Sequence, residues 1–337
     1  MYKLFVKIAT RYLLKNKLYS FINIFGLAIG IASFVLIMLY VNHEQSYDQF
    51  EGSENVQRLY MDYLEGGEWV EGDANAYIVS GPTFKEEFPE VLDFVRLRQM
   101  YGVFLLRDNV VFDQNKGSLA DPNFFQIFDR KLANGDVNKA LNEPYSIVLT
   151  KPLAKKIFGS EEPMGKTVKV FDNNSPVFTV TGILEESARN THIKNDFLIS
   201  FKTFYTWKSF EGDWDFTWNQ NMYFTYLKLD PKADVALLKQ KIMDFKVDGL
   251  PYERHNIEPL EDIHLHSDKP YEAEANGNAS RISFLLAIAL IIIVLSWLNY
   301  VNLSTAKSLE RAKETGIRKV AGAQKPQIIL QSLLESL

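Results

Sequence analysis

The 337-residue sequence contains no cysteine and only five histidines. Two of them form His264-Leu265-His266, a spacing that would place both imidazoles on one face of a strand. One histidine pair is too few ligands for a structural or catalytic zinc site, and no cysteine thiolate is available to complete it. The composition therefore disfavours a metal site. The absence of cysteine is compatible with an oxidising compartment and decides nothing further.

A nucleotide-binding loop is also missing, although residues 158–167, FGSEEPMGKT, look like one. A phosphate loop has four residues between its two glycines and connects a strand to a helix. Here Gly159 and Gly165 are separated by five residues, and the pattern predicts a helix before the loop at 152–158 and a strand after it at 167–171. We therefore expect a surface turn and no nucleotide or other cofactor on this chain.

Two long apolar runs dominate the rest of the sequence, at residues 21–41 and 282–303. A helix of 21 residues is about 31 Å long, enough to cross the hydrocarbon core of a bilayer. The first run is longer than the apolar region of a signal peptide and lacks a small-x-small cleavage site, so we expect an uncleaved anchor. The sequence predicts two membrane crossings with one large region between them.

Charge predicts the orientation of these crossings. Residues 1–43 contain five Lys or Arg and no acid, and the residues after Leu303 contain six Lys or Arg and three Glu, whereas the region between holds 26 basic and 39 acidic residues. The positive-inside rule then places both termini in the cytoplasm and the large middle region outside. This topology fits a bacterial inner membrane protein with a periplasmic domain.

The N-terminal residues suggest two further features of the membrane region. Basic residues recur every four positions from Lys3 to Lys15, which predicts a basic amphipathic helix on the anionic inner face or a positive flank that fixes topology. Within the first apolar run, Gly26 and Gly30 form a small-xxx-small pair. That pair is compatible with close packing against another helix, although the pattern is common by chance.

The middle region has the pattern of a mixed α and β domain built on open sheets. Predicted strands lie at 77–79, 94–97, 102–106, 109–112, 146–149, 177–183 and 223–229. Predicted helices lie at 83–88, 123–128, 152–158 and 233–246. The predicted fold class is thus α+β, an integral membrane protein with two transmembrane helices flanking a mixed α+β periplasmic domain.

The middle region offers little support for an enzyme. Trp207, Trp214 and Trp218, with Asp213 and Asp215, could form a sugar-binding cleft, but such aromatic residues more often belong to the core of a sheet. No Ser–His–Asp arrangement can be argued from the linear sequence. We expect a protein without catalytic activity of its own.

The segment after the second run, KSLERAKETGIRKVAGA at residues 307–323, carries charges of both signs and two glycines. A flank that only fixes topology would need Lys and Arg alone. Glu310, Glu314, Ile317 and Val320 favour a short cytoplasmic element with a partner-facing surface, interrupted by the glycines.

This segment, in the context RAKETGIRKVAGAQKPQIILQSLLESL, resembles the cytoplasmic coupling segment of FtsX-like, MacB-type ABC transporter permeases. IEPLEDIHLHSD and the second crossing ending LNYVNLSTAKS are similar to the same family. FPEVLDFVRL, ADPNFFQIF, SIVLTKPLAKKIFG and FTVTGILEE resemble its MacB-like periplasmic core domain. The resemblance covers essentially the whole chain in order.

The resemblance implies a permease subunit that docks onto a separate ABC ATPase, which binds the ATP, and that couples hydrolysis to movement of the periplasmic domain for export or mechanotransmission. Its implied partners are that ATPase, a second permease copy or half, the lipid bilayer and a periplasmic protein, with no nucleic acid. The implied coupling residues are Glu310, Arg311, Lys313, Glu314, Gly316, Ile317, Arg318, Lys319 and Gly322.

The predicted organisation follows from these patterns and from the resemblance. It comprises a basic amphipathic helix (1–17), a first transmembrane helix (18–43), the periplasmic core domain (44–280), a second transmembrane helix (281–303), and a coupling segment with the start of a third transmembrane helix (304–337). Family members continue through at least two further crossings, so we expect a fragment, a truncated product or half of a split permease. The alternative is a two-crossing receptor whose periplasmic domain senses a ligand; a heptad seam after residue 303 would favour it.

Overall fold

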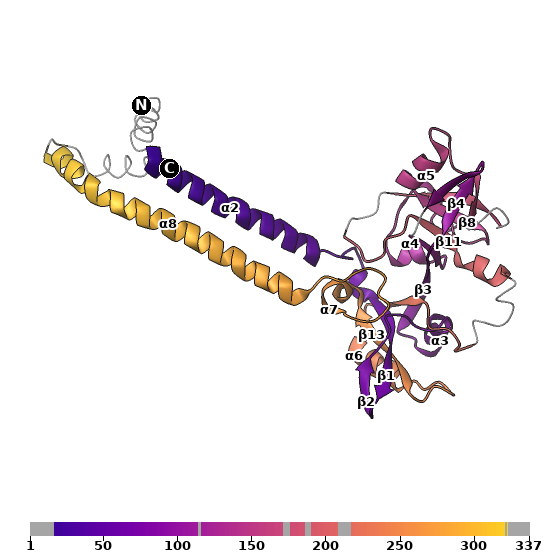
Figure 1. Cartoon of the computed structure of the whole chain (residues 1–337). Helices are drawn as coiled ribbons and strands as arrows, with labels where there is room; N and C mark the ends of the chain where they lie inside the picture. Colours follow the sequence, from indigo (N-terminus) through magenta and orange to yellow (C-terminus); the bar gives the residue numbers. More distant parts are fainter. Residues whose placement is uncertain are drawn as a thin grey trace. The chain divides into compact units, whose positions relative to one another are not determined.

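The computed structural model describes residues 17–113, 116–170, 176–185, 190–207, 217–320 and 322 (Figure 1). The chain divides into two compact units, which are Met1–Gln45 with Ala279–Leu337, and Ser46–Asn278. We call the first the helix unit and the second the outer unit. The predicted amphipathic helix and the predicted third crossing lie outside the described residues.

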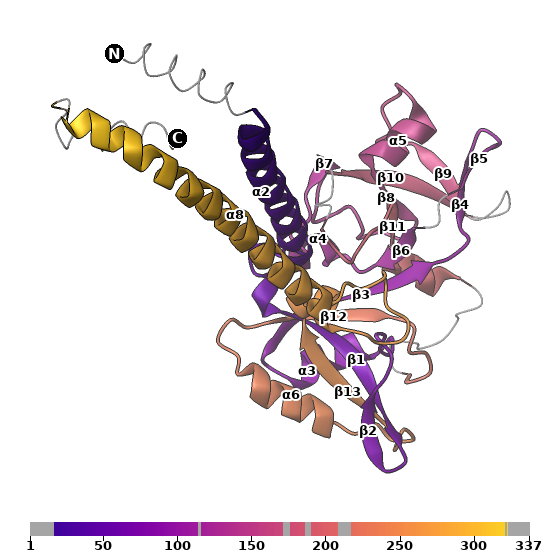
Figure 2. The same cartoon turned by 60° about the vertical axis from the view of Figure 1, so that its left-hand side comes forward.

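The helix unit consists, in its described part, of α2 (Lys17–Gln45) and α8 (Ala279–Val320). The two helices lie side by side along their length (Figures 1 and 2). Each contains a stretch long and apolar enough to cross a membrane, Ile24–Gln45 in α2 and Ala279–Asn302 in α8. The structure therefore confirms the two apolar helices that the sequence predicts.

Helix α8 extends without interruption well beyond its apolar stretch. Its 42 residues include Gly316, which the sequence interpretation expects to break the helix. That expectation is wrong, because a single glycine costs a helix only about 1 kcal/mol, which its helix-favouring neighbours offset. Gly322, by contrast, lies just after the helix end with a φ of +91°. The left-handed conformation of this glycine is typical of a residue that terminates a helix.

The outer unit is built on one mixed sheet, where the sequence predicted open sheets. Its strands are β1 (Val56–Glu65), β2 (Glu68–Glu71), β3 (Val91–Met100), β4 (Phe104–Arg107), β5 (Val110–Asp113), β6 (Gly117–Ala120), β7 (Leu132–Gly135), β8 (Ser146–Thr150), β9 (Thr167–Val170), β10 (Val177–Leu184), β11 (Phe197–Ser200), β12 (Phe224–Leu229) and β13 (Glu253–Pro259).

The strand order is β13-β1-β12-β3-β6-β11-β8-β10-β9-β4-β5, with β2 paired to β1 and β7 paired to β10. The pairs β8–β10 and β6–β11 are parallel, and the other pairs are antiparallel. Strands distant in sequence are therefore neighbours, as where β12 separates β1 from β3. The strands are connected by short α-helices and by 3-10 helices, which are labelled η. The α-helices are α3 (Ser80–Glu87), α4 (Phe124–Ile127), α5 (Lys151–Phe158), α6 (Val235–Asp244) and α7 (Ile263–His266), and the 3-10 helices are η1 (Ser53–Asn55), η2 (Phe201–Thr206) and η5 (Leu260–Asp262).

Local sequence signals explain several of these helices. Asp234 caps α6, because its side chain accepts a hydrogen bond from the backbone N–H of Leu237 at 3.0 Å. Helix α5 has Pro152 in its first turn and is followed directly by Gly159, whose φ is +62°. A turn then leads into β9, so the helix–loop–strand order predicted around the GKT sequence is confirmed. The order is opposite to the one that a phosphate loop requires.

One predicted strand is wrong, and a second segment that was considered as a strand is helical. Residues 77–79 form a turn that leads into α3, and Ile78 is fully buried there without belonging to a strand. The His264-Leu265-His266 sequence forms the one-turn helix α7, with His264 buried and His266 exposed. In both cases the apolar residues indicate that the segment is buried, and a buried segment can be a turn or a helix as well as a strand.

Candidate functional site

Two short segments of the outer unit connect it to α2 and α8, and they meet within that unit. The first, residues 46–50, follows α2, and the second, residues 263–278, precedes α8. The rings of Tyr47 and His264 stack with centroids 3.4 Å apart and an interplanar angle of 5°. Ser53, close behind the first segment, donates a hydrogen bond to Glu261 at 2.6 Å. The entry and exit of the outer unit are therefore attached to each other.

The segment after α2 is held by a buried hydrogen-bond network centred on Asp48. Its carboxylate accepts from the Thr191 hydroxyl at 2.5 Å, and its Oδ2 lies 2.6 Å from His192 Nδ1. The other ring nitrogen of His192 lies 2.7 Å from the hydroxyl of Tyr226 on β12. Asp48, His192 and Tyr226 are almost completely buried. The network thus links the segment that follows α2 to the central strand β12.

The electrostatics of this network keep Asp48 ionised. Burial by itself raises the pKa of Asp48, but the charge of His192 and the hydrogen bonds from His192 and Thr191 outweigh it and hold that pKa below its usual range. Burial raises the pKa of Tyr226, so its hydroxyl remains a neutral hydrogen-bonding group. A charged carboxylate and a neutral phenol therefore lie on either side of His192.

The segment before α8 is held by a second buried network centred on Arg58 of β1. The Arg58 guanidinium donates to Glu258 at 2.6 Å, to Ser267 at 2.9 Å and to both carboxylate oxygens of Glu272. Lys269 donates to the other oxygen of Glu258 at 2.8 Å. Glu258 lies on β13, directly opposite Arg58 across the strand pair. These bonds join β1, β13 and the segment that leads into α8.

The paired charges offset the cost of burying Arg58, whose side chain is fully inaccessible to solvent. Burial by itself lowers the pKa of Arg58, but hydrogen bonding to Glu272 and the charges of Glu258 and Glu272 outweigh it, so the pKa rises. Burial raises the pKa of Glu272, but the hydrogen bond and charge of Arg58, together with the hydrogen bond from Ser267, outweigh burial and hold that pKa below its usual range. We define Asp48, Arg58, His192, Tyr226, Glu258 and Glu272 as the junction cluster. Removing one member would leave its partners buried without compensation.

In the helix unit, two glycines of α2 contact α8 closely. A Cβ atom added at Gly30 would lie 1.8 Å from Ser296 Oγ, and one added at Gly26 would lie 3.3 Å from Asn299 Nδ2. Residue numbers rise along α2 as they fall along α8, so the helices are antiparallel. The small-xxx-small pair thus allows close backbone approach, one of the alternatives that the sequence left open.

The predicted coupling residues lie on the polar end of α8 and just beyond it. Glu310, Lys313, Glu314 and Ile317 are spaced to share one helix face. Ile317 is 63% exposed, and Gly316 has nothing within 4 Å of where a Cβ would be. At 1.5 Å per residue, Glu310 lies about 12 Å beyond the end of the apolar stretch at Asn302. The helix therefore carries this set away from the membrane-spanning part.

The other clusters singled out from the sequence have structural surroundings. Trp207 and Trp218 are partly buried against the hydrophobic core, while Trp214, Asp213 and Asp215 lie outside the described residues. Among the described residues, no group of three or more His, Asp or Glu could hold a metal ion. The junction cluster was missed, because its members come together only through the fold. The polar residues Gln57, Arg58 and Asp62 within one apolar stretch were the available signal.

Comparison with known proteins identifies the family. The sequence profile of the MacB-like periplasmic core domain matches residues 20–245. This chain belongs to that family of permeases. It is similar to the macrolide export ATP-binding/permease protein MacB of Neisseria meningitidis serogroup A, with 21% identity over 337 residues, which are 98% of this chain and 49% of that protein. The chain thus spans about half the length of the curated MacB relatives that it matches.

Two further relatives agree with this assignment. The uncharacterized ABC transporter permease YvrN of Bacillus subtilis is 23% identical over 348 residues, covering 98% of this chain and 82% of that protein. A domain of a putative permease protein from Porphyromonas gingivalis has a similar fold, with a TM-score of 0.52, 18% identity and coverage of 63% of this chain and 92% of that domain. The MacB-like resemblance read from the sequence is therefore confirmed.

Proposed function

We propose that this chain is the membrane subunit of an ABC transporter, in which a separate ATPase moves the outer unit through α8. The observation that carries the proposal is the continuity of α8 from Ala279 to Val320. At 1.5 Å per residue this helix is about 63 Å long, roughly twice the hydrocarbon thickness of a bilayer. One helix can then span the membrane and still present its polar end to a cytoplasmic partner.

The proposed docking surface comprises the predicted coupling residues at the polar end of α8. Glu310, Lys313, Glu314 and Ile317 share one face, and Arg311 and Arg318 follow at the neighbouring positions. Charges of both signs beside an exposed isoleucine suit charge-assisted hydrogen bonds to a groove on the ATPase. In this proposal ATP is bound by that ATPase, and this chain holds no cofactor.

Movement of α8 would reach the sheet through the junction cluster. The segment before α8 is bonded to Arg58 through Glu272 and Ser267, and the segment after α2 is bonded to β12 through His192. Buried ion pairs and hydrogen bonds keep a fixed geometry better than exposed ones, because their loss leaves charges without compensation. Displacement of either helix would therefore move β1, β12 and β13. The work done outside would be export or delivery of force.

Membrane crosslinking tests the docking surface. We would express the chain with its native downstream sequence, crosslink it in membranes, and identify captured ABC ATPases by mass spectrometry. Glu314→Arg and Arg318→Glu should abolish capture, because they reverse charges on the docking surface. Glu86→Arg and Lys232→Glu, reversals at exposed positions of the outer unit, are the matched controls and should leave capture unchanged. Capture that survives both reversals on α8 would refute this docking surface.

We also propose a bacterial inner membrane location, with both termini in the cytoplasm and the outer unit in the periplasm. The natural chain has no cysteine, so a cysteine introduced by substitution is the only thiol that a maleimide can label. In spheroplasts, a membrane-impermeant maleimide should label Asp248→Cys, an exposed position in the outer unit, at once. It should label Lys313→Cys only after the membrane is permeabilised. The reverse pattern would overturn the proposed orientation.

A further inference from the structure

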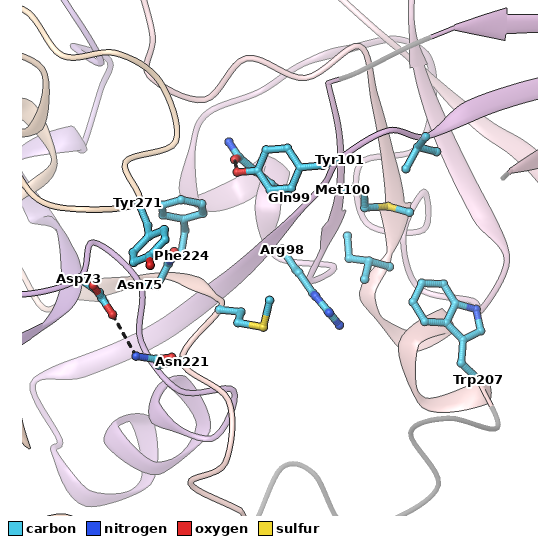
Figure 3. Close-up of a pocket in the computed structure, with 13 residues that line it drawn as sticks. Asp73, Asn75, Arg98, Gln99, Met100, Tyr101, Trp207, Asn221, Phe224 and Tyr271 are labelled. Atoms are coloured by element: carbon cyan, nitrogen blue, oxygen red, sulfur yellow. Dashed lines mark hydrogen bonds between the residues drawn. The ribbon is translucent and has the colours of Figure 1, made fainter.

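The outer unit contains a cavity of about 650 Å³, whose wall includes a carboxylate, side-chain amides and several aromatic rings (Figure 3). Its volume lies within the range of small-molecule sites, for which about 300–1,000 Å³ is typical. All its lining residues belong to the outer unit, and none of them is a member of the junction cluster or of the proposed docking surface. The cavity is therefore separate from both sites described above.

Asp73 is the one acid among the described residues that line the cavity. Its carboxylate is fixed through Oδ2, which accepts from the Tyr63 hydroxyl at 2.7 Å and from the Asn221 amide at 3.1 Å. Within the described part of the chain, no group donates to the other oxygen of Asp73 or to the side-chain oxygen of Asn75, which also lines the cavity. This wall therefore has hydrogen-bond acceptors and a negative charge to offer, which suits a ligand that is a cationic donor.

Tyr271 lies beside this acidic wall. The backbone N–H of Ala74, between Asp73 and Asn75, donates to the carbonyl oxygen of Pro270 at 3.0 Å. Tyr271 lines the cavity, is 72% exposed and has a φ of +58°. A tyrosine rarely adopts this left-handed conformation, and packing of the exposed ring cannot compensate for it, whereas strained residues are common at ligand sites. An aromatic face next to a carboxylate is suited to an ammonium group.

The rest of the wall is mostly apolar or aromatic. Phe224, Met222 and Tyr101 line it, and Met222 and Tyr101 are 53% and 79% exposed. Trp207 lines the cavity on the side away from Asp73, as the close-up shows (Figure 3). The volume between these two ends is larger than an ammonium group needs. A ligand that carries an apolar group would therefore contact the rest of the wall.

Arg98 is the one basic residue among the described residues that line the cavity. Its guanidinium lies over the rings of Phe204 and Tyr223, at 5.3 Å and 5.7 Å from their centroids. It is engaged there and contributes no group to a ligand site. The described wall thus provides no partner for a phosphate or a carboxylate, which argues against a zwitterionic lipid headgroup.

From these features we propose that the cavity binds a primary amine that carries an apolar or aromatic group. A primary ammonium has three N–H donors, and Asp73 would accept one of them while neutralising its charge. The ring of Tyr271 would contact the cation, and the apolar group would extend toward Trp207. The acidic wall selects the amine, and the aromatic wall selects what it carries.

A bound amine would also act on the segment that precedes α8. Tyr271 directly precedes Glu272, which accepts hydrogen bonds from Arg58 of the junction cluster. An amine held between Asp73 and Tyr271 would restrain this segment and so be sensed at the start of α8. This consequence rests on the proposed function, whereas amine binding itself does not.

Isothermal titration calorimetry on the full chain, purified in a maltoside detergent, tests the binding. The probe is 4-phenylbutylamine at pH 7, where an alkylamine is protonated. We expect saturable binding that Asp73→Asn weakens by at least about tenfold, because a charged hydrogen-bond partner is lost. Asp230→Asn is the matched control, since Asp230 also accepts a hydrogen bond, from the backbone N–H of Lys232 at 2.8 Å, but does not line this cavity.

A second variant tests the aromatic contact without a buried position. Tyr271→Ala should weaken binding by about twofold to tenfold, because a cation–π contact is lost. Tyr252→Ala is its control, since Tyr252 is 67% exposed and does not line the cavity. Circular dichroism checks that each variant is folded.

Modified probes separate charge from apolar contact. The alcohol 4-phenylbutanol lacks the charge, so it should bind more weakly than the amine and equally to the natural chain and Asp73→Asn. Butylamine lacks the ring and should bind more weakly than 4-phenylbutylamine to both. The N,N-dimethyl derivative of the probe keeps the charge but has one N–H donor, so it should also bind less tightly.

Four outcomes overturn the inference. They are no saturable binding up to millimolar amine, equal effects of Asp73→Asn and Asp230→Asn, binding of 4-phenylbutanol as tight as that of the amine, and tighter binding of dihexanoylphosphatidylethanolamine than of the amine. The last result would assign the cavity to a lipid headgroup. Because the assay uses no ATPase, its failure is distinguishable from failure of the proposed function, which shows as lost ATPase capture.

Discussion

The two units of this chain distribute polar and apolar side chains in opposite ways. In the helix unit, Leu36 and Trp297 are 67% and 63% exposed. In the outer unit, Arg58 and Tyr226 are completely inaccessible. Exposed apolar residues are stable where lipid is the solvent, and buried charges are stable only where partners satisfy them. The contrast shows that each unit is stabilised for a different surrounding.

The contacts that hold each unit together differ accordingly. In lipid there is little gain from burying more apolar surface, so α2 and α8 depend on close approach at Gly26 and Gly30. In the outer unit, ion pairs and hydrogen bonds connect segments about 200 positions apart, as between Arg58 and Glu258. The first kind of contact should be sensitive to side-chain size, and the second to charge. The following predictions test this difference.

The largest expected effect comes from removing the charge of Arg58. In Arg58→Met, Glu258 and Glu272 lose their common partner while remaining largely buried, so we expect destabilisation of about 3–5 kcal/mol. Urea unfolding of the purified chain, followed by tryptophan fluorescence, measures it. Lys241→Met, which breaks an ion pair with Glu90 at a more exposed site, should cost only about 0–1 kcal/mol. Equal effects would contradict the role of burial.

The next effect comes from size in the helix unit. In Gly30→Leu, the side chain would collide with Ser296, so we expect a loss of about 1–3 kcal/mol in the packing of α2 against α8. Thermal unfolding in detergent, followed by circular dichroism, measures it. Gly316→Ala is the control, because open space surrounds that position and alanine favours helix by up to about 1 kcal/mol. Unchanged stability of Gly30→Leu would show that the two helices do not pack through this face.

A smaller effect concerns pH and His255 in the outer unit. Burial lowers the pKa of His255 to about 3, below the usual value of 6.5. The unfolded chain therefore takes up a proton between these values and the folded chain does not, so acidification through this window favours unfolding. We expect a loss of about 1 kcal/mol between pH 6 and pH 5. Urea unfolding at both values should show this loss in the natural chain and a smaller loss in His255→Phe.

The smallest expected effect concerns the loop that looks like a phosphate loop. Lys166 forms a surface ion pair with Glu161 in the turn between α5 and β9. We therefore expect Lys166→Ala to leave both the melting temperature of the chain and ATP binding by the permease–ATPase complex unchanged. Nucleotide binding measured with a fluorescent ATP analogue checks this. Loss of binding in this variant would mean that the loop contacts nucleotide.

The sequence predicted well the elements whose signals are local. The apolar runs, the helix with Pro152 and the strand at 177–183 were all found, because periodicity and turn residues are properties of neighbouring positions. Strands β1 and β13 were missed. In β1, Gln57, Arg58 and Asp62 interrupt the alternation expected of a half-buried strand. Arg58 and Asp62 are tolerated there because partners on β13, and for Arg58 also Glu272, bind their side chains, and no local pattern reports this.

The same difference between local and long-range signals applies to the candidate functional site. The proposed coupling segment could be singled out because most of it is a contiguous stretch of α8, although the continuity of the helix through Gly316 was not foreseen. The junction cluster depends on side chains from distant strands and loops. Asp48 and His192, for example, are separated by 144 positions. Only the sheet order, with β12 between β1 and β3, places these residues together.

The central claim is that α8 transmits movement as one uninterrupted helix, and Ala306→Pro tests it most directly. A fluorophore on Asp268→Cys, an exposed position in the segment before α8, would report on the outer unit in membranes containing the ATPase. Addition of ATP should change its emission when α8 is intact. With Ala306→Pro, which breaks the helix between the apolar stretch and the docking surface, ATPase capture should persist while the ATP-dependent change disappears. An undiminished change in the proline variant would contradict transmission through α8.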